Sequence, residues 1–155
     1  MSAARFHYYL RVRYPECDAQ KVVFNSRYGE YVDLAVTEFL RALGHGEALI
    51  SGGIDYQLVR QVTEWKAPVR FDQVLDVAVS TQKVGNTSFV LLAEFRVAGE
   101  ERVLATVETT YVMVDAVTLV KAPLPDAFRA TLERGAPGVE IDHAGHLPGR
   151  GQTVR

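Results

Sequence analysis

The residues best suited to chemistry lie in one short stretch, where an acidic side chain precedes the predicted start of a long helix. Asp18 stands in a polar loop, and Asn25 and Ser26 come just before the helix. A helix start leaves about four backbone N–H groups unpaired and carries a partial positive charge, which suits a developing oxyanion. A carboxylate just upstream can act on the same carbon. Both residue types also have plain structural uses, because most loop aspartates hold turns and asparagine is a common helix cap.

One long helix must position this stretch. Apolar residues recur at spacings of three and four from Tyr28 to Leu43, and Gly44 is the expected C-terminal cap. Further apolar residues widen this face beyond a stripe, which predicts a helix that other elements wrap. Roughly 17 residues at about 1.5 Å each span about 26 Å, enough to cross a sheet of about five or six strands.

Alternating apolar and polar residues predict strands on both sides of this helix. Turns at Gly85-Asn86 and Gly99-Glu100 would join neighbouring strands as antiparallel hairpins. The predicted strands are residues 6–13, 56–65, 74–84, 87–98 and 102–115. A strand, a long helix and then four strands predict an α+β domain, in which a curved antiparallel β-sheet wraps one long central helix.

The chain of 155 residues is predicted to form a single domain over residues 1–134. Residues 46–53 read as a flexible connection, and residues 124–132 as a short terminal helix. From residue 135 to 155 the sequence is rich in glycine and lacks periodicity, which predicts a flexible C-terminal tail. We expect His143 and His146, which lie in this tail, to be solvated rather than to bind a metal.

The charge balance and the cysteine content narrow the partners and the compartment. A formal net charge of −2 without a basic cluster argues against nucleic acid as a partner. No run approaches the roughly 18 apolar residues of a membrane span, and the N-terminus lacks the apolar core of a secretion signal. Cys17 is the only cysteine, which excludes an internal disulfide and fits a reducing compartment. We therefore expect a cytoplasmic protein with no membrane span.

The candidate stretch resembles the motif of hotdog-fold acyl-CoA thioesterases of the 4-hydroxybenzoyl-CoA thioesterase-like group, roughly Y-x-x-x-D-x-x-G-x-V-[FY]-[HY]-x-x-Y. The matching residues are Tyr14, Asp18, Val23, Phe24 and Tyr28. The sequence departs from the motif at Lys21, where glycine is usual, and at Asn25, where His or Tyr is usual. In outline the resemblance covers residues 6–126. It implies a hotdog fold and an acyl-CoA thioesterase that needs no metal or redox cofactor.

The resemblance also implies residue roles. Asp18 would be the nucleophile or the general base, and backbone amides near Asn25 would polarise the thioester carbonyl. Basic residues suit the phosphates of coenzyme A. The implied substrate contacts are Val23, Phe24, Tyr28, Lys66, Arg70, Gly85, Thr87 and Ser88. Lys21 fits either a solvated loop residue or a contact to a phosphate. Lys66 and Arg70 also fit ordinary surface charge, and Tyr28 also fits the core.

Sites in this family lie between two subunits, so the resemblance implies a homodimer or a homotetramer built from two dimers. The acyl group, and whether coenzyme A or acyl carrier protein bears it, stay open. One alternative is a protein that binds acyl thioesters without catalysis. Another is a hotdog hydratase or dehydratase, which commonly pairs Asp with His in a motif like D-x-N-P-x-H, whereas no histidine stands between Asp18 and His45.

Overall fold

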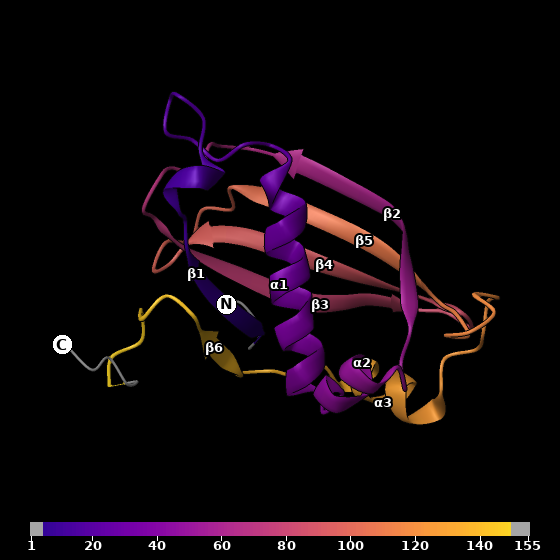
Figure 1. The fold of residues 1–155 in the computed structure, drawn as a ribbon. Helices are drawn as coiled ribbons and strands as arrows, with labels where there is room; N and C mark the ends of the chain where they lie inside the picture. The colour runs from indigo at the N-terminus through magenta and orange to yellow at the C-terminus, as the bar shows by residue number, and fades with distance from the viewer. Residues whose placement is uncertain (1–4, 150–155) are drawn as a thin grey trace.

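The computed structural model describes residues 5–149 of the chain. Figure 1 shows one long helix lying across one face of a curved sheet. The elements are β1 (Phe6–Arg11), a 3-10 turn η1 (Tyr14–Glu16), α1 (Arg27–Ala42), α2 (Gly46–Ser51), β2 (Tyr56–Trp65), β3 (Val74–Val84), β4 (Ser88–Val97), β5 (Ala105–Met113), α3 (Asp126–Arg134) and β6 (Glu140–Asp142). The predicted α+β arrangement, a curved sheet around one long helix, is confirmed.

The six strands of the described part of the chain form one sheet in the order β2-β5-β4-β3-β1-β6. All neighbouring strands are antiparallel except β1 and β6, which run parallel. Burial alternates along β4 and β5, so one face of each strand packs toward α1 while the other is partly open. This pattern is what period-two apolar residues dictate.

Helix α1 buries a wide apolar surface against the sheet. Its buried side chains are Tyr28, Tyr31, Val32, Ala35, Val36, Phe39 and Leu40. The aromatic rings interlock: Tyr28 lies 5.4 Å from Phe95 between ring centroids, and Phe6 lies 5.4 Å from Phe39. Such packing fixes the helix relative to the strands. The start of α1 is therefore held at one end of the sheet.

Two segments differ from the sequence-based expectation. Residues 46–51, expected as a flexible connection, form the short helix α2. Within the expected flexible tail, Glu140–Asp142 form the short strand β6 beside His7–Tyr9. The free edge of β1 supplies backbone partners for this segment, and the Tyr8 hydroxyl lies 2.8 Å from Nδ1 of His143. The rest of the predicted tail, residues 150–155, lies outside the described residues.

At the other edge of the sheet, β5 is the only strand within residues 5–149 that pairs with β2. Most of its residues are exposed, including the large apolar side chains of Leu58, Val59, Val62 and Trp65. An edge strand with exposed apolar side chains is a ready template for another strand. Within the described residues no helix is both long and apolar enough to cross a membrane.

Candidate functional site

The loop between β1 and α1, residues 12–26, carries Asp18 in a tight turn. The backbone N–H of Asp18 donates to the carbonyl of Val22 at 2.9 Å, and that of Lys21 donates to the carbonyl of Asp18 at 2.9 Å. The Asp18 Oδ1 atom accepts hydrogen bonds from the backbone N–H groups of Gln20 at 2.8 Å and of Val22 at 3.4 Å. The half-buried carboxylate therefore holds its own turn through one oxygen.

Lys21 completes this turn with a left-handed backbone, at φ 61°. Glycine enters this region freely, whereas an L-residue is strained there. The Lys21 carbonyl accepts a hydrogen bond from Phe71 N–H at 2.9 Å, which joins the turn to the segment before β3. The departure from the motif at this position thus keeps the backbone shape that glycine would supply.

Glu16, which was not among the predicted site residues, anchors the loop. Its carboxylate is buried, at 4% exposure, and accepts hydrogen bonds from Arg13 N at 2.7 Å and from the Tyr31 hydroxyl at 2.9 Å. The Arg13 guanidinium adds a salt bridge at 2.8 Å. Burial alone would raise the pKa of Glu16, but these donors outweigh it and hold the pKa below its usual value. In a polar loop, a lone glutamate gives no signal of such burial.

At the start of helix α1, the side chain of the capping residue makes no hydrogen bond to the backbone N–H groups of the first turn. Ser26, rather than Asn25, is the N-cap, and its side chain makes no capping hydrogen bond. Arg27 N–H donates to the carbonyl of Phe24 at 2.9 Å. Asn25 is exposed and lines a cavity beside the helix start. The first turn therefore presents backbone donors next to a hollow.

That cavity, of about 310 Å³, lies between the loop and the connection from β2 to β3. Its lining residues are Val22, Val23, Asn25, Tyr28, Trp65, Lys66, Ala67 and Pro68. The two walls are joined by a β-bridge between Val22 and Arg70 and by a 2.9 Å hydrogen bond from Val23 N–H to the Val69 carbonyl. The structure thus brings together four of the predicted site residues, which are Val23, Asn25, Tyr28 and Lys66.

Two aromatic side chains shape the same cavity. The rings of Tyr28 and Trp65 meet edge to face with centroids 6.1 Å apart. Burial raises the pKa of the Tyr28 phenol, although a backbone hydrogen bond from Val69 opposes the shift. The phenol therefore stays neutral at physiological pH. Trp65, which remains 49% exposed, was not among the predicted site residues, because its position at a strand end gave no sign of a cavity.

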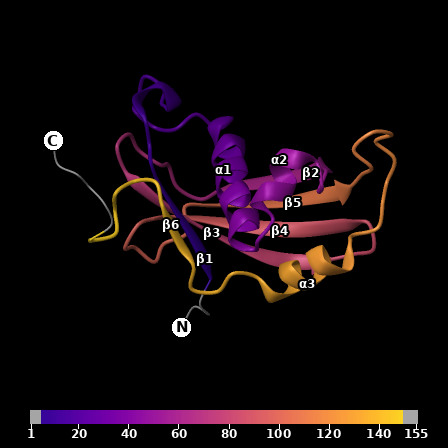
Figure 2. The ribbon, with the colours of Figure 1, turned by 60° about the horizontal axis from the view of Figure 1, so that its bottom comes forward.

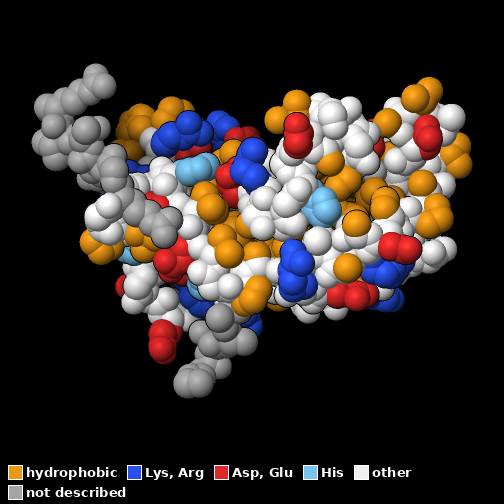
Figure 3. All heavy atoms as spheres, turned by 90° about the horizontal axis from the view of Figure 1, so that it is seen from below, with side chains coloured by type: hydrophobic (Ala, Val, Ile, Leu, Met, Phe, Trp, Pro, Cys, Tyr) orange, Lys and Arg blue, Asp and Glu red, His pale blue; other side chains and the backbone are white. Residues whose placement is uncertain are grey.

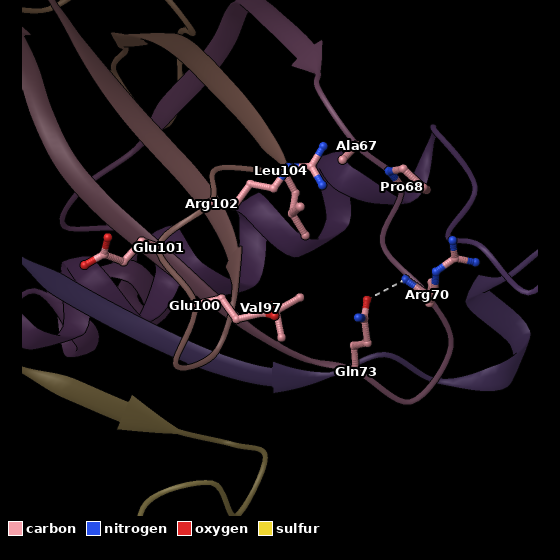
Figure 4. A pocket seen from close by; sticks show the side chains of 9 residues that line it. All are labelled: Ala67, Pro68, Arg70, Gln73, Val97, Glu100, Glu101, Arg102 and Leu104. Atoms are coloured by element: carbon pink, nitrogen blue, oxygen red, sulfur yellow. Dashed lines mark hydrogen bonds between the residues drawn. The ribbon is translucent and has the colours of Figure 1, made fainter.

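A second cavity, of about 340 Å³, adjoins the first and shares Ala67 and Pro68 with it. It contains two arginines, Arg70 and Arg102 (Figure 4). In Figure 4 the Arg102 side chain extends toward Ala67, and the Arg70 backbone N–H donates to the Gln73 side chain at 2.8 Å. Cationic side chains beside an apolar bend suit a ligand with an anionic end.

The remaining predicted residues lie elsewhere. Phe24 is exposed next to the first cavity, and Asp18 is in the adjoining turn but does not line the cavity. Gly85, Thr87 and Ser88 lie at the turn between β3 and β4, at the opposite end of the sheet from Trp65. This follows from the ladder, since Ser88 pairs with Val112 near the end of β5 while β2 begins there. One chain alone does not bring the two groups together.

The described residues 5–149 contain no group of three or more His, Cys, Asp and Glu side chains arranged to hold a metal ion. The polar groups around the cavities are instead backbone amides, the Asp18 carboxylate in the adjoining turn, basic side chains, and Glu100 and Glu101 in the second cavity. This set can polarise a carbonyl, supply a base or nucleophile, and bind anionic groups. Such an arrangement suits cleavage of an activated acyl group.

Comparisons with known proteins point to one family. A family model described as the Thioesterase-like superfamily matches residues 12–132. The acyl-CoA thioester hydrolase YbgC of Escherichia coli is 27% identical over 135 residues, which cover 86% of this chain and 100% of YbgC. A putative esterase of Aquifex aeolicus is 29% identical over 119 residues, covering 76% and 91% of the two chains. The structure of a gentisyl-coenzyme A thioesterase matches with a TM-score of 0.72 at 28% identity, over 82% of this chain and 98% of that one.

Proposed function

Because the chain belongs to the Thioesterase-like superfamily, we propose that it hydrolyses acyl-coenzyme A thioesters to a free acid and coenzyme A. The observation that carries this proposal is the cavity at the start of α1, which meets the Asp18 turn on one side and basic residues on the other. The similarity to YbgC and to a gentisyl-coenzyme A thioesterase supports the substrate class. Either coenzyme A or acyl carrier protein could present the acyl group, and substrate tests separate the two.

Asp18 is proposed to act on the thioester carbon. Both of its side-chain hydrogen bonds go to Oδ1, which would orient Oδ2 for reaction. Oδ2 either attacks the carbon, giving a mixed anhydride that water cleaves, or takes a proton from the attacking water. In both routes the carbon–sulfur bond breaks and the coenzyme A thiolate leaves, to be protonated by solvent. Backbone N–H groups at the first turn of α1 would stabilise the oxyanion, a contribution of roughly 100- to 1000-fold in rate.

Coenzyme A itself would lie across the two adjoining cavities. Its phosphates would contact Arg70 and Arg102 in the second cavity, and Lys66 lines the first. Val23, Tyr28 and the exposed ring of Phe24 would contact the acyl end. Charge-assisted hydrogen bonds to arginine are strong and geometrically specific, so these residues would set affinity for the carrier rather than the rate of cleavage.

The site would be completed in a homodimer formed through β2. The exposed apolar side chains along this edge strand would be buried by antiparallel pairing with a second copy. Such pairing places the start of one β2 beside the end of the other. It would therefore bring Gly85, Thr87 and Ser88 of one chain toward the cavity of the next.

The decisive test is hydrolysis of a panel of aliphatic and aromatic acyl-CoAs, followed by thiol release. Asp18→Asn should lower kcat by about 100-fold or more. Asp142→Asn is the matched control, because Asp142 also holds a turn, by accepting from Ala144 N at 2.9 Å and Leu147 N at 2.7 Å, outside the site. An unchanged rate for Asp18→Asn removes Asp18 from the mechanism, and no thiol release by the wild type refutes the proposed function.

A second candidate function is binding of acyl thioesters without hydrolysis. One observation favours it: the Asp18 carboxylate engages its own turn and does not line the cavity. Calorimetric titration with an acyl-CoA separates the two functions. Tight binding with the thioester recovered intact supports the binding protein, whereas release of thiol supports the enzyme.

A further inference from the structure

The connection between β5 and α3 projects an apolar tip. This tip, residues 115–121, carries three aliphatic side chains in solvent: Val117 is 90% exposed, Leu119 is 56% exposed and Val120 is 63% exposed. Single exposed apolar residues are ordinary, but three within four positions form a patch that water solvates poorly. In Figure 3 hydrophobic side chains gather at the end of the molecule that carries this tip.

The tip is built as a rigid hairpin rather than as a loose loop. The Asp115 carboxylate accepts hydrogen bonds from the backbone N–H groups of Val117 and Thr118, each at 2.9 Å. Asp115 N–H donates to the Val120 carbonyl at 2.9 Å, and Leu119 N–H donates to the Asp115 carbonyl at 2.9 Å. These bonds fix the direction in which the aliphatic side chains point.

Leu119 holds a left-handed backbone at φ 58°. A bulky side chain rarely adopts this conformation, and such strain persists where the surrounding structure enforces it. Glycine enters this backbone region without strain, yet the chain places a large apolar side chain there. Strain combined with exposure of an apolar group suggests a contact that a single chain does not satisfy.

The position of the tip indicates what it contacts. It leaves β5 where β2 begins, since Met113 pairs with Tyr56 and Val114 N–H donates to the Asp55 carbonyl at 3.1 Å. The tip is thus adjacent to the start of the free edge strand. Figure 2 shows that it rises toward the side of the sheet on which α1 lies. The candidate cavity lies on that side too, but at the other end of β2, beside Trp65.

Two-fold pairing of β2 with a second copy of the chain would bring the tip of one chain close to the cavity of the other. The ten residues of β2 extend about 33 Å, too far for the tip to reach the cavity of its own chain. When two such strands pair antiparallel over their length, the start of one lies beside the end of the other. The tip of each chain then lies next to the cavity of its partner, on the same face of the joined sheet.

We propose that this tip forms an apolar wall of the site in the second subunit, where Val117, Leu119 and Val120 contact the acyl group or the aliphatic part of the pantetheine arm. The inference rests on the proposed function and on pairing through β2. It makes the tip a determinant of substrate affinity that acts between subunits. The strained backbone at Leu119 then serves to aim the side chain at the neighbouring cavity.

The first experiment measures acyl-CoA kinetics for the double variant Val117→Ser, Val120→Ser. Loss of apolar contact should raise KM about tenfold and leave kcat within about a factor of two. Val90→Ser, a half-buried valine of β4 outside the core, is the control and should leave both constants unchanged. An unchanged KM in the double variant, or a wild-type protein that is monomeric by light scattering at assay concentration, overturns the inference.

The second experiment asks in which subunit the tip acts. Chains carrying Asp18→Asn with a wild-type tip are co-expressed with chains carrying Asp18 and the double tip substitution, and the mixed dimer is isolated by two affinity tags. If the tip acts on the partner's site, the site that retains Asp18 also receives the wild-type tip. The mixed dimer then shows the wild-type KM at about half the wild-type kcat. A KM equal to that of the tip variant assigns the tip to its own chain and refutes the proposal.

The result is distinguishable from failure of the proposed function. If the wild type releases no thiol from any acyl-CoA, the hydrolase assignment fails, and the tip is tested by binding instead. A non-hydrolysable thioether analogue of acyl-CoA is then titrated into the wild type and the double variant. A Kd about tenfold higher for the variant supports the proposed apolar wall, and equal affinities overturn the proposal.

Discussion

The hydroxyl of Tyr31 donates a 2.9 Å hydrogen bond to the buried carboxylate of Glu16, and this bond fastens helix α1 to the loop that carries Asp18. Burial, followed by the hydrogen bond to Glu16, raises the pKa of Tyr31 far above its usual value, so the phenol remains a donor. The relative position of the turn and the helix start therefore depends on one buried pair.

We predict that Tyr31→Phe lowers the free energy of unfolding by about 1.5–3 kcal/mol, because a buried carboxylate loses a donor. Urea unfolding measures this. The control Glu30→Gln breaks only the exposed Arg27–Glu30 pair and should change stability by less than about 0.5 kcal/mol. Equal effects of the two substitutions would show that the buried bond does not hold the loop.

The Glu16 carboxylate should also make stability depend on acidic pH. Its pKa is lower folded than unfolded, so its stabilisation is fully present above the unfolded value of about 4.3 and is lost as pH falls through the folded value. We predict that wild-type stability decreases over this range more steeply than that of Glu16→Gln. Unfolding curves from pH 6 down to about pH 3 test the difference, and parallel curves would contradict it.

His7 gives the opposite dependence. Its Nδ1 lies 2.7 Å from Asp76, and this hydrogen bond is the main reason that the pKa of His7 is raised. The stabilisation is fully present below the unfolded pKa of about 6.5 and is lost as pH rises through the higher folded value. We predict that Asp76→Asn removes this loss, so that the stability difference between wild type and variant shrinks from pH 6 to about pH 9. A constant difference would refute the linkage.

Lys21→Gly should stabilise the protein. Relief of the left-handed backbone is worth about 1–2 kcal/mol, and the extra freedom of glycine in the unfolded chain takes back about 0.5–1 kcal/mol. The net gain should be roughly 0.5–1 kcal/mol in thermal unfolding. Gln20→Gly, in the same turn without a positive φ, should destabilise instead. If Lys21→Gly lowers stability as Gln20→Gly does, backbone strain at Lys21 does not destabilise the wild-type protein.

Local patterns predict most of the fold but only part of the site. Apolar periodicity gives α1 and the long strands, because each signal lies within a few neighbouring residues. β6 is missed because its stability comes from β1, more than a hundred residues earlier in the sequence. The cavity residues Val23 and Lys66 come together through backbone pairing between Val22 and Arg70, which composition does not encode. Glu16 is missed for the same reason, since its burial depends on Tyr31.

Arg102 should bind the carrier rather than the acyl group. It lines the second cavity, which adjoins the one at the helix start. Within residues 5–149 no ion pair to Arg102 is found, so its guanidinium is available to bind a phosphate. We predict that Arg102→Ala raises KM for acyl-CoA about tenfold with little change in kcat, because a charge-assisted hydrogen bond is worth about 1.5–3 kcal/mol. The same acyl group on N-acetylcysteamine, which lacks phosphate, should show no change in KM. Glu101→Gln in the same cavity is the control, and an equal loss with both thioesters would place Arg102 at the acyl end instead.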